Sequence, residues 1–361
     1  MKEVVRFYPT ARQKTNKFCK WKAHKSINLF AVGIVIVLLM VACKGKSERT
    51  TLNGQSSPTE CRSVQHEMGK TQICSQPQRI VALGPSMMEL LLALEKQPVG
   101  YADLLGFHRG DFDNPSQQIP LLGNRVTQSL GNVGTSSNPS LEAIARLKPD
   151  LILGTEANRE QYATLSQIAP TLILPYGTGD DWQRSLQMVA KVLGHPEQAQ
   201  KVLEEHNQRL ATARQKFSSI TAAHKRVLML ASTLLSQDIR IQLNDNSCGA
   251  LVEKLGFQLV SLPNSKRISV GISQEALPEL KTDMIFILGG NRTVDQTVDA
   301  SNFEEHQLKA IKRDWQKNAI AQSLPASKEN RVYFISGYRC LAIPGPVGAE
   351  LFLDELRRQL L

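Results

Sequence analysis

The stretch "PSLEAIARLKPDLILG" (residues 139–154) contains a helix start, an amphipathic run and an apolar strand in direct succession. Ser140 precedes the apolar periodicity, as an N-cap residue does, and the uninterrupted apolar run that follows the helix is typical of a strand buried on both faces. The same order recurs in "ISQEALPELKTDMIFIL" (residues 272–288), where Glu275 holds the place of Glu142. The repeat predicts helix–strand units in both halves of the chain.

The rest of the chain from residue 79 onward follows the same alternation. Apolar runs such as "RIVALG", "TLILPYG", "RVLMLAS" and "RVYFIS" alternate with helical patterns such as "PSMMELLLALE", in which Ser86 and Glu89 have the spacing of a capping box. Alternating strands and helices with near-continuous apolar strands are typical of parallel sheets covered on both faces. The predicted fold class is therefore α/β with mostly parallel sheets.

Length and composition indicate how the chain is divided. With 361 residues it is too long for one typical core, and its 42% apolar and 21% charged content is that of a globular protein. The run "HPEQAQKVLEEHNQRLATARQKF" has strong helix formers throughout and predicts one connecting helix over residues 195–218. We expect an N-terminal lobe at residues 61–194 and a C-terminal lobe at residues 219–361.

The N-terminal region has the features of an export signal. Eight Lys or Arg and one Glu give residues 1–42 a charge of +7 out of the total of +10, so the basic balance does not indicate a nucleic-acid partner. The apolar run before Cys43 is short for a membrane span and suits a signal peptide, and "LMVAC" resembles a bacterial lipobox. We expect lipidation at Cys43 and a flexible tether at residues 43–60; the alternative is a short anchor helix with an incidental cysteine.

Four further cysteines can form disulfides, which an exported protein is free to do. The stretch "CRSVQHEMGKTQIC" predicts a β-hairpin that places Cys61 opposite Cys74. Cys248 and Cys340 both lie in the C-terminal half, which favours a second pair. No Cys or His spacing indicates a zinc site.

The chain from about residue 61 resembles a known family. Stretches such as "NVGTSSNPSLEAIARLKPDLILG", "YATLSQIAPTLIL", "VAKVLGHPEQAQKVL" and "GPVGAELFLDELRRQLL" resemble, in this order, the ferric-siderophore-binding lipoproteins of bacterial ABC importers, in the helical-backbone class that also includes cobalamin-binding proteins. The resemblance implies two Rossmann-like lobes joined by one long helix, with a ligand cleft between them. It implies a binding protein without catalysis or cofactor, whose ligand is a ferric siderophore or ferric citrate.

The resemblance also implies partners and a location. The cargo would be delivered to an ABC permease, homodimeric or heterodimeric, from the periplasmic face of the inner membrane, to which a lipid anchor would hold the protein. Glu142 and Glu275 would dock on permease arginines, one from each lobe. The alternative for both carboxylates is stabilisation of a helix start through the helix dipole.

Ligand-binding candidates come from the loops that follow the predicted strands, because ligands of open α/β sheets bind beyond the carboxyl ends of the strands. Arginines recur there, and a guanidinium offers paired donors to the carboxylate or catecholate oxygens of an anionic ferric complex. Arg159 and Tyr338 are the first choices, since each follows a strand closely. The candidates are Ser86, His108, Arg159, Tyr176, Arg240, Arg267, Tyr338 and Arg339, and the same loops also hold Arg109 and Arg292.

Three other functions remain open. Haem or cobalamin cargo is the nearest alternative, with Tyr176 or Tyr338 as a ligand. A site for bare Zn²⁺ or Mn²⁺ would need several converging His and acidic residues, and only His108 is well placed, so we expect the siderophore to hold the iron without a protein metal site. A nucleotide-using enzyme is disfavoured, because no G-x-G-x-x-G, P-loop or G-x-S-x-G motif follows a strand.

Overall fold

The computed structural model describes residues 61–261, 269–295 and 297–361. The predicted signal peptide, the tether, Cys43 and Arg267 lie outside the described residues. Within the described ranges, no helix is long and apolar enough to cross a membrane.

The N-terminal lobe is built on a six-stranded sheet with the order β6-β5-β4-β3-β7-β8. All neighbours are parallel except β5 and β6, which form an antiparallel pair at one edge. Before this sheet, β1 (Arg62–His66) and β2 (Gly69–Ile73) form the predicted hairpin, which the Cys61–Cys74 disulfide closes. The strands of the sheet are β3 (Ile80–Leu83), β4 (Gly100–Asp103), β5 (Gly131–Thr135), β6 (Asn138–Pro139), β7 (Leu151–Thr155) and β8 (Thr171–Leu174).

Helices cover both faces of this sheet, as near-continuous apolar strands require. Side chains of one strand alternate between the faces. Val81 and Leu83 pack with α3 and α4, whereas Ile80 and Ala82 pack with α1 and α5. The helical segments of this lobe are α1 (Pro85–Ala93), α2 (Pro115–Gln118), η1 (Gly123–Arg125), α3 (Leu141–Arg146), η2 (Glu156–Asn158), α4 (Tyr162–Ile168) and α5 (Asp181–Val192).

The C-terminal lobe has a second six-stranded sheet, ordered β12-β10-β9-β13-β14, with β11 also pairing with β9. Its centre is parallel, but β10 is antiparallel to both β9 and β12. The reason is local: only residues 233–238 separate β9 from β10, too few for the crossover that a parallel pair needs. The strands are β9 (Arg226–Ser232), β10 (Ile239–Gln242), β11 (Gln258–Leu259), β12 (Ser269–Ile272), β13 (Met284–Gly289) and β14 (Val332–Ser336).

This second sheet is also covered on both faces. Met229 and Phe286 pack with α8 and α12, whereas Leu230 and Ile287 pack with α9, α10 and α11. Trp182 in α5 and Trp315 in α9 are buried packing groups. The remaining helical segments are α7 (Ser218–Ala223), α8 (Ser247–Lys254), η3 (Gln274–Glu279), α9 (Phe303–Lys317), α10 (Ala319–Ser323), α11 (Pro325–Lys328), η4 (Tyr338–Ala342) and α12 (Pro346–Leu360).

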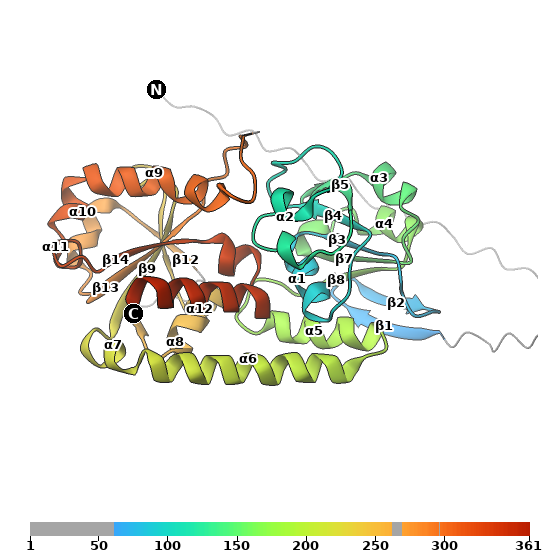
Figure 1. The fold of residues 1–361 in the computed structure, drawn as a ribbon, viewed down its shortest axis with the longest axis horizontal. Helices are drawn as coiled ribbons and strands as arrows, with labels where there is room; N and C mark the ends of the chain where they lie inside the picture. Colours follow the sequence, from blue (N-terminus) through green and yellow to red (C-terminus); the bar gives the residue numbers. More distant parts are fainter. Residues whose placement is uncertain (1–60, 262–268, 296) are drawn as a thin grey trace, which may run out of the picture. The chain divides into compact units, whose positions relative to one another are not determined.

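One long helix leads the chain from the first sheet to the second. This helix, α6 (Pro196–Lys216), has 21 residues and begins with Pro at its first turn, as predicted. It runs alongside α5 and then α12 (Figure 1). Its buried stripe consists of Ala199, Val202, His206 and Leu210. The histidine in this stripe is neutral at physiological pH, because burial against Trp182 and the Lys254 and Arg209 charges lower its pKa to about 4.

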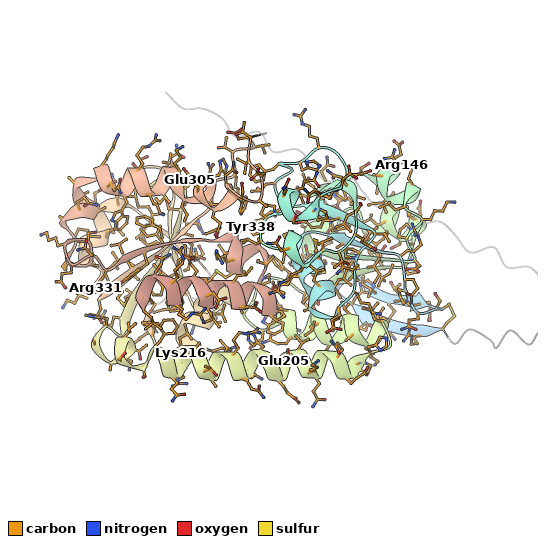
Figure 2. All side chains as sticks on the ribbon, viewed as in Figure 1. Arg146, Glu205, Lys216, Glu305, Arg331 and Tyr338 are labelled. Atoms are coloured by element: carbon orange, nitrogen blue, oxygen red, sulfur yellow. A yellow bond between two sulfur atoms is a disulfide. The ribbon has the colours of Figure 1, made fainter. Side chains whose placement is uncertain are left out.

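The two lobes share part of their core. Tyr338, Ile343 and Val347 belong to the C-terminal lobe but pack in the apolar cluster of α1, α5 and the first sheet. Figure 2 shows Tyr338 at this boundary, close to α1. A helix and one apolar cluster therefore cross between the lobes, while each lobe also has a buried cluster of its own.

The predicted capping box at Ser86 and Glu89 is wrong. The N-cap of α1 is Gly84, and Ser86 is buried inside the first turn. Glu89 reaches the other lobe instead: its carboxylate accepts hydrogen bonds from the backbone N–H groups of Gly345 (2.8 Å) and Gly348 (2.7 Å) at the start of α12. Burial raises the pKa of Glu89 to about 7, against the lowering effect of the backbone donors and of Arg125.

The two copies of the repeated sequence phrase fold differently. Ser140 is the N-cap of α3, and its hydroxyl oxygen accepts from the backbone N–H of Ala143 (3.2 Å). In the second copy, Pro278 lies inside a 3₁₀-helix, η3, whose N-cap Ser273 makes no such bond. Proline lacks the N–H of a regular α-helix, which explains why this copy does not form one.

Candidate functional site

A large cavity opens between the two lobes at the carboxyl ends of the strands. It has a volume of about 1060 Å³, ample for a small metal complex. The N-terminal lobe contributes Leu104, Leu105 and Tyr176 to its lining. The C-terminal lobe contributes most of the rest, chiefly from β9, β10, β13, η4 and the loops after them. We refer to this cavity as the cleft.

Two arginines supply positive charge to the cleft. Arg240 on β10 donates from Nε to Ser269 Oγ (2.7 Å) and lies 3.9 Å from a carboxylate oxygen of Asp238. Arg292 follows β13 and makes no ion pair with any described residue. The guanidinium of Arg292 is therefore available to an anionic ligand, and that of Arg240 is held at a fixed orientation.

Two tyrosines line the cleft at the boundary of the lobes. The Tyr176 hydroxyl donates to the Leu341 carbonyl oxygen, and its pKa is raised to about 12 by burial and by the Glu89 charge, with Arg292 acting against this. Burial, and then the Asp103 charge, also raises the pKa of Tyr338 well above its usual value. Tyr338 meets Phe303 edge to face at 5.0 Å between ring centroids. Both phenols are neutral at physiological pH and offer hydrogen-bonding groups rather than charge.

Neutral polar groups complete the lining. Gln242, Ser269, Asn291 and Thr233 face the cleft from the C-terminal lobe. Ser232, at the end of β9, has a buried hydroxyl oxygen without a hydrogen-bond partner among the described residues. A buried polar group of this kind is costly unless something satisfies it, so it marks a place where a ligand can bind.

The structure brings together three of the sequence candidates and separates four. Tyr176, Arg240 and Tyr338 line the cleft, together with Arg292. Arg159, Ser86, His108 and Arg339 are not among the lining residues, and Arg267 lies outside the described residues.

The four separated candidates have other partners. Arg159 is exposed, 3.8 Å from Glu156 of its own turn. Ser86 is buried in α1. The Nε2 atom of His108 forms a hydrogen bond of 3.0 Å with the Asp111 carbonyl oxygen. We therefore withdraw these three as ligand contacts.

Arg339 is withdrawn for a different reason. It is 8% exposed and donates to both carboxylate oxygens of Glu304 (2.7 and 2.6 Å) and to the Leu351 carbonyl oxygen (2.8 Å). A buried guanidinium bound in this way holds η4, α9 and α12 together. Its role is structural.

The sequence analysis missed Gln242, Ser232 and Asn291. Ser232 ends β9 and Asn291 follows β13, the same kind of position that identified Tyr338. Neither side chain is charged or aromatic, the types that an anionic ferric complex suggests first. Gln242 lies within β10, as Arg240 does, but lacks the charge that singled out Arg240. No group of three or more His, Cys, Asp or Glu side chains in the described residues is arranged to hold a metal ion.

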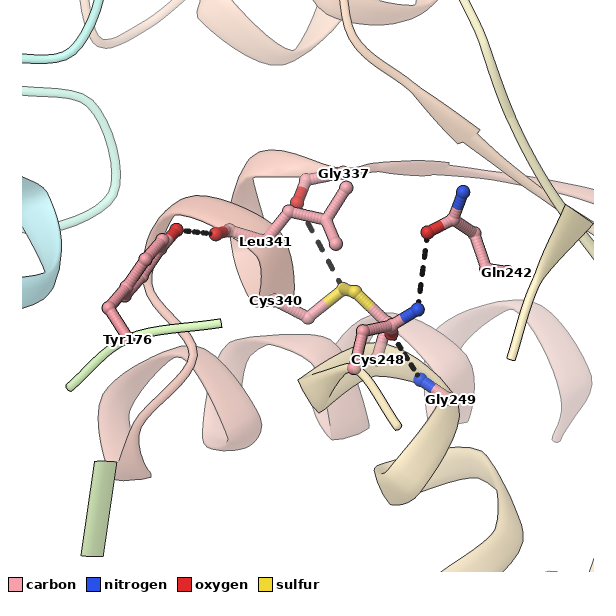
Figure 3. Close-up of a disulfide and its surroundings, with 8 residues drawn as sticks. Tyr176, Gln242, Cys248, Gly249, Gly337, Cys340 and Leu341 are labelled. Atoms are coloured by element: carbon pink, nitrogen blue, oxygen red, sulfur yellow. Dashed lines mark hydrogen bonds between the residues drawn. A yellow bond between two sulfur atoms is a disulfide. The ribbon is translucent and has the colours of Figure 1, made fainter. Parts of the chain in front are cut away.

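Both disulfides expected from the sequence are present. Cys61 pairs with Cys74, and Cys248 in α8 pairs with Cys340 in η4. The second bond lies directly behind the cleft lining (Figure 3). Glu142 and Glu275 are both exposed, outside the cleft.

Comparison with known proteins agrees with this geometry. The chain is 26% identical over 348 residues to a probable siderophore-binding lipoprotein, YfiY, of Bacillus subtilis, covering 93% of this chain and 98% of the relative. It is also 26% identical to the Fe(3+)-citrate-binding protein YfmC of the same organism, covering 86% and 89%.

Solved structures share the fold. SirA of Staphylococcus aureus, crystallised with staphyloferrin B, superposes with a TM-score of 0.65 at 22% identity, over 83% of this chain and 98% of the other. FeuA of Bacillus subtilis, crystallised with ferri-bacillibactin, gives 0.63 at 19% identity, over 83% and 98%. The family model described as periplasmic binding protein matches residues 80–338. With this match, the two lobes and the cleft between them, the chain belongs to the periplasmic binding protein family.

Proposed function

We propose that this protein is the substrate-binding component of an ABC importer and captures an Fe(III)-siderophore or ferric citrate complex in the cleft. The observation that carries the proposal is the cleft itself, with about 1060 Å³ of space and the Arg240 and Arg292 side chains in its lining. Relatives of near-equal length are named for siderophore and ferric citrate binding, which supports the same ligand class. The protein would bind its cargo without chemical change.

The chemistry of the lining suits a ferric complex with peripheral oxygen atoms. Guanidinium groups pair with carboxylate, catecholate or hydroxamate oxygens. The amide of Gln242 and the hydroxyls of Tyr176 and Ser232 add neutral hydrogen-bonding groups. Apolar contacts come from Leu104 and other leucines. In this proposal the chelator supplies every iron ligand, and Arg267 remains a candidate contact from the sequence alone.

A binding experiment tests the function directly. The chain from residue 44 onward, which includes every described residue, is titrated calorimetrically with ferric citrate, the ferric complex of Desferal, ferric enterobactin, haem and cobalamin. We expect saturable one-to-one binding of at least one ferric complex. Binding of haem or cobalamin alone would replace the proposed cargo, and binding of none would refute the function.

We also propose that the protein is anchored by lipid at Cys43 on the outer face of the cytoplasmic membrane. The lipobox-like sequence supports this, as do relatives named as lipoproteins. Acyl chains contribute about 0.8 kcal/mol per buried CH₂ group, so several chains give stable anchorage. Cys43→Ser should abolish acyl labelling; normal processing and membrane fractionation of the variant would refute the anchor.

The proposed function also requires a surface on which the protein docks to its permease. Glu142 and Glu275 are exposed carboxylates, one in each lobe, at matching places of a repeated sequence phrase. A dimeric permease presents two equivalent docking surfaces, which two acidic points on one chain can match. We propose that these carboxylates pair with basic residues of the permease.

A further inference from the structure

The Cys248–Cys340 disulfide joins η4, which contributes side chains to the cleft, to α8, which does not. Both cysteines are fully buried, with their Cα atoms 5.1 Å apart, and neither lines the cleft. Figure 3 shows the bond behind η4, on the side away from Tyr176. One cysteine belongs to α8, after β10, and the other to η4, after β14. The bond therefore connects segments that follow strands on opposite sides of the central pair β9 and β13.

On one side, the bond holds a segment that presents side chains to the cleft. The η4 segment is a single π-helical turn in which the backbone N–H of Ile343 donates to the Tyr338 carbonyl oxygen (3.2 Å). Tyr338, Leu341 and Ala342 line the cleft, while Cys340 points inward between them. Single π turns are rare and occur often at functional sites. A displacement of Cys340 would move the cleft-facing residues on both sides of it.

On the other side, a chain of hydrogen bonds connects the N-terminus of α8, which contains Cys248, to Arg240. The Asn246 side chain caps α8 by accepting from the Gly249 N–H (2.9 Å), and its Nδ2 donates to Gln242 Oε1 (3.2 Å). Gln242 Nε2 donates to Ser269 Oγ (3.2 Å), which also accepts from Arg240 Nε (2.7 Å). Of these residues, Gln242, Ser269 and Arg240 line the cleft.

We propose that the Cys248–Cys340 disulfide is a positioning bond for ligand recognition. It fixes the distance between the wall that carries Tyr338 and Leu341 and the network that orients Arg240, so that the cleft is preorganised before the ligand arrives. A preorganised site binds more tightly, because its side chains need not be ordered at the moment of binding. This inference rests on the proposed function.

The test compares the two disulfides of the same chain. Cys248→Ser/Cys340→Ser removes the bond behind the cleft, and Cys61→Ser/Cys74→Ser removes the bond of the β1–β2 hairpin. Dissociation constants for ferric citrate, ferric Desferal and ferric enterobactin are measured calorimetrically at a temperature where all three proteins are folded. We expect affinity about tenfold weaker for the first variant, as for the loss of order in two or three cleft side chains, and unchanged affinity for the second.

Stability alone does not give this pattern. Both variants should unfold at lower temperature, the first more so, because its disulfide closes a loop of 92 residues rather than 13. A purely structural bond would therefore lower the unfolding temperature and leave every dissociation constant of the folded variant unchanged, which would overturn the proposal. The dissociation constants for the three complexes should also differ less from one another in the first variant than in the wild type. If the wild type binds none of them, the proposed function fails rather than this inference.

A milder variant keeps the proposal testable if the first double variant does not fold. Asn246→Ser retains the disulfide and an N-cap oxygen but removes the side-chain amide that donates to Gln242. We expect about threefold weaker binding of the best ferric probe with a nearly unchanged unfolding temperature, since the neutral hydrogen bond to Gln242 is lost while the N-cap oxygen is kept. Wild-type affinity in Asn246→Ser would show that the network does not position Arg240.

Discussion

At the scale of single residues, binding of an anionic ligand depends on which arginine side chains line the cleft. Arg292 lines the cleft without a carboxylate partner among the described residues, while Arg159 lies outside it beside Glu156. Both follow strands of their lobes, so position in the sequence does not distinguish them. Their side chains should therefore differ sharply in importance for an anionic ligand.

Arg292→Ala should weaken binding of ferric citrate by about 1.5–3 kcal/mol, as the loss of a charged hydrogen bond does. Thermal stability should hardly change, because Arg292 has no ion pair with a described residue to lose. Calorimetric titration measures the first effect and a thermal melt the second. Arg159→Ala serves as the matched control and should bind like the wild type. Equal affinity in the two variants would remove Arg292 from the site.

The raised pKa of Glu89 makes the folding stability of the protein depend on pH. The folded chain holds the Glu89 proton up to about pH 7, whereas the unfolded chain releases it near 4.5, because the raised pKa exists only in the folded state. Between these values the folded chain binds more protons, so its stability falls as the pH rises. The effect amounts to about 3 kcal/mol, at roughly 1.4 kcal/mol per pKa unit.

Glu89→Gln should remove this dependence. The unfolding free energy of the wild type minus that of Glu89→Gln should fall by about 3 kcal/mol from pH 4.5 to 7 and stay constant above. The lowered pKa of His206 has the opposite effect, costing stability as the pH falls from 6.5 to 4, but it is present in both proteins and cancels in the difference. Urea titrations at several pH values provide the measurement. Parallel curves would show that Glu89 does not titrate in this range.

At the scale of helices and strands, the two copies of the repeated sequence phrase differ in what the serine before the helix does. Ser140 accepts from the Ala143 N–H and caps α3. Ser273 makes no such bond, and the pKa of the exposed Glu275 carboxyl is lowered first by its own backbone N–H and then by the neighbouring Ser273 hydroxyl. The two copies therefore look alike in sequence but use the serine differently.

Ser140→Ala should lower the unfolding free energy by about 1 kcal/mol, the usual value of an N-cap. Ser273→Ala should cost less than half of that, because no backbone donor loses its partner. Urea unfolding of the two variants under identical conditions makes the comparison. Equal losses would mean that Ser273 also caps its helix.

The strands and helices were largely predictable from the sequence, and the reason is burial. Runs such as Met284–Leu288 are apolar without interruption because both faces of each sheet are covered, and this pattern survives any detail of packing. The antiparallel β10 and β12 escaped prediction because each has only four residues and carries polar side chains. Pro278, inside η3, explains why the second copy of the phrase is irregular.

The site was predictable only in part. Strand ends identified Tyr176 and Tyr338, since topology alone places such loops at the cleft, whereas Arg240, expected in a loop, lies within β10. The direction of a loop side chain depends on contacts distant in the sequence. Arg339 follows Tyr338 directly, yet the π turn directs it to Glu304. Glu89 was assigned to a local cap, because its true partners lie more than 250 residues further along the chain.

At the scale of the whole molecule, one carboxylate on each lobe is expected to engage one permease. Glu142→Gln and Glu275→Gln keep the side-chain shape and remove the charge. Affinity for ferric citrate should stay unchanged in both, because neither residue lines the cleft. Uptake of iron and association with the permease should fall, most in the double variant. Full uptake by the double variant would leave only a role at the helix starts.

The core shared by the lobes has a calorimetric consequence. Phe303, Tyr338 and Val347 pack in one apolar cluster with residues of the first sheet, so little apolar surface between the lobes is left to be buried on binding. Only the cleft and the ligand lose contact with water. At about 0.45 cal/mol/K per Å² of apolar surface, a few hundred Å² give a heat-capacity change of binding near −0.2 kcal/mol/K. Titrations at several temperatures should therefore show a binding enthalpy that changes only gently with temperature.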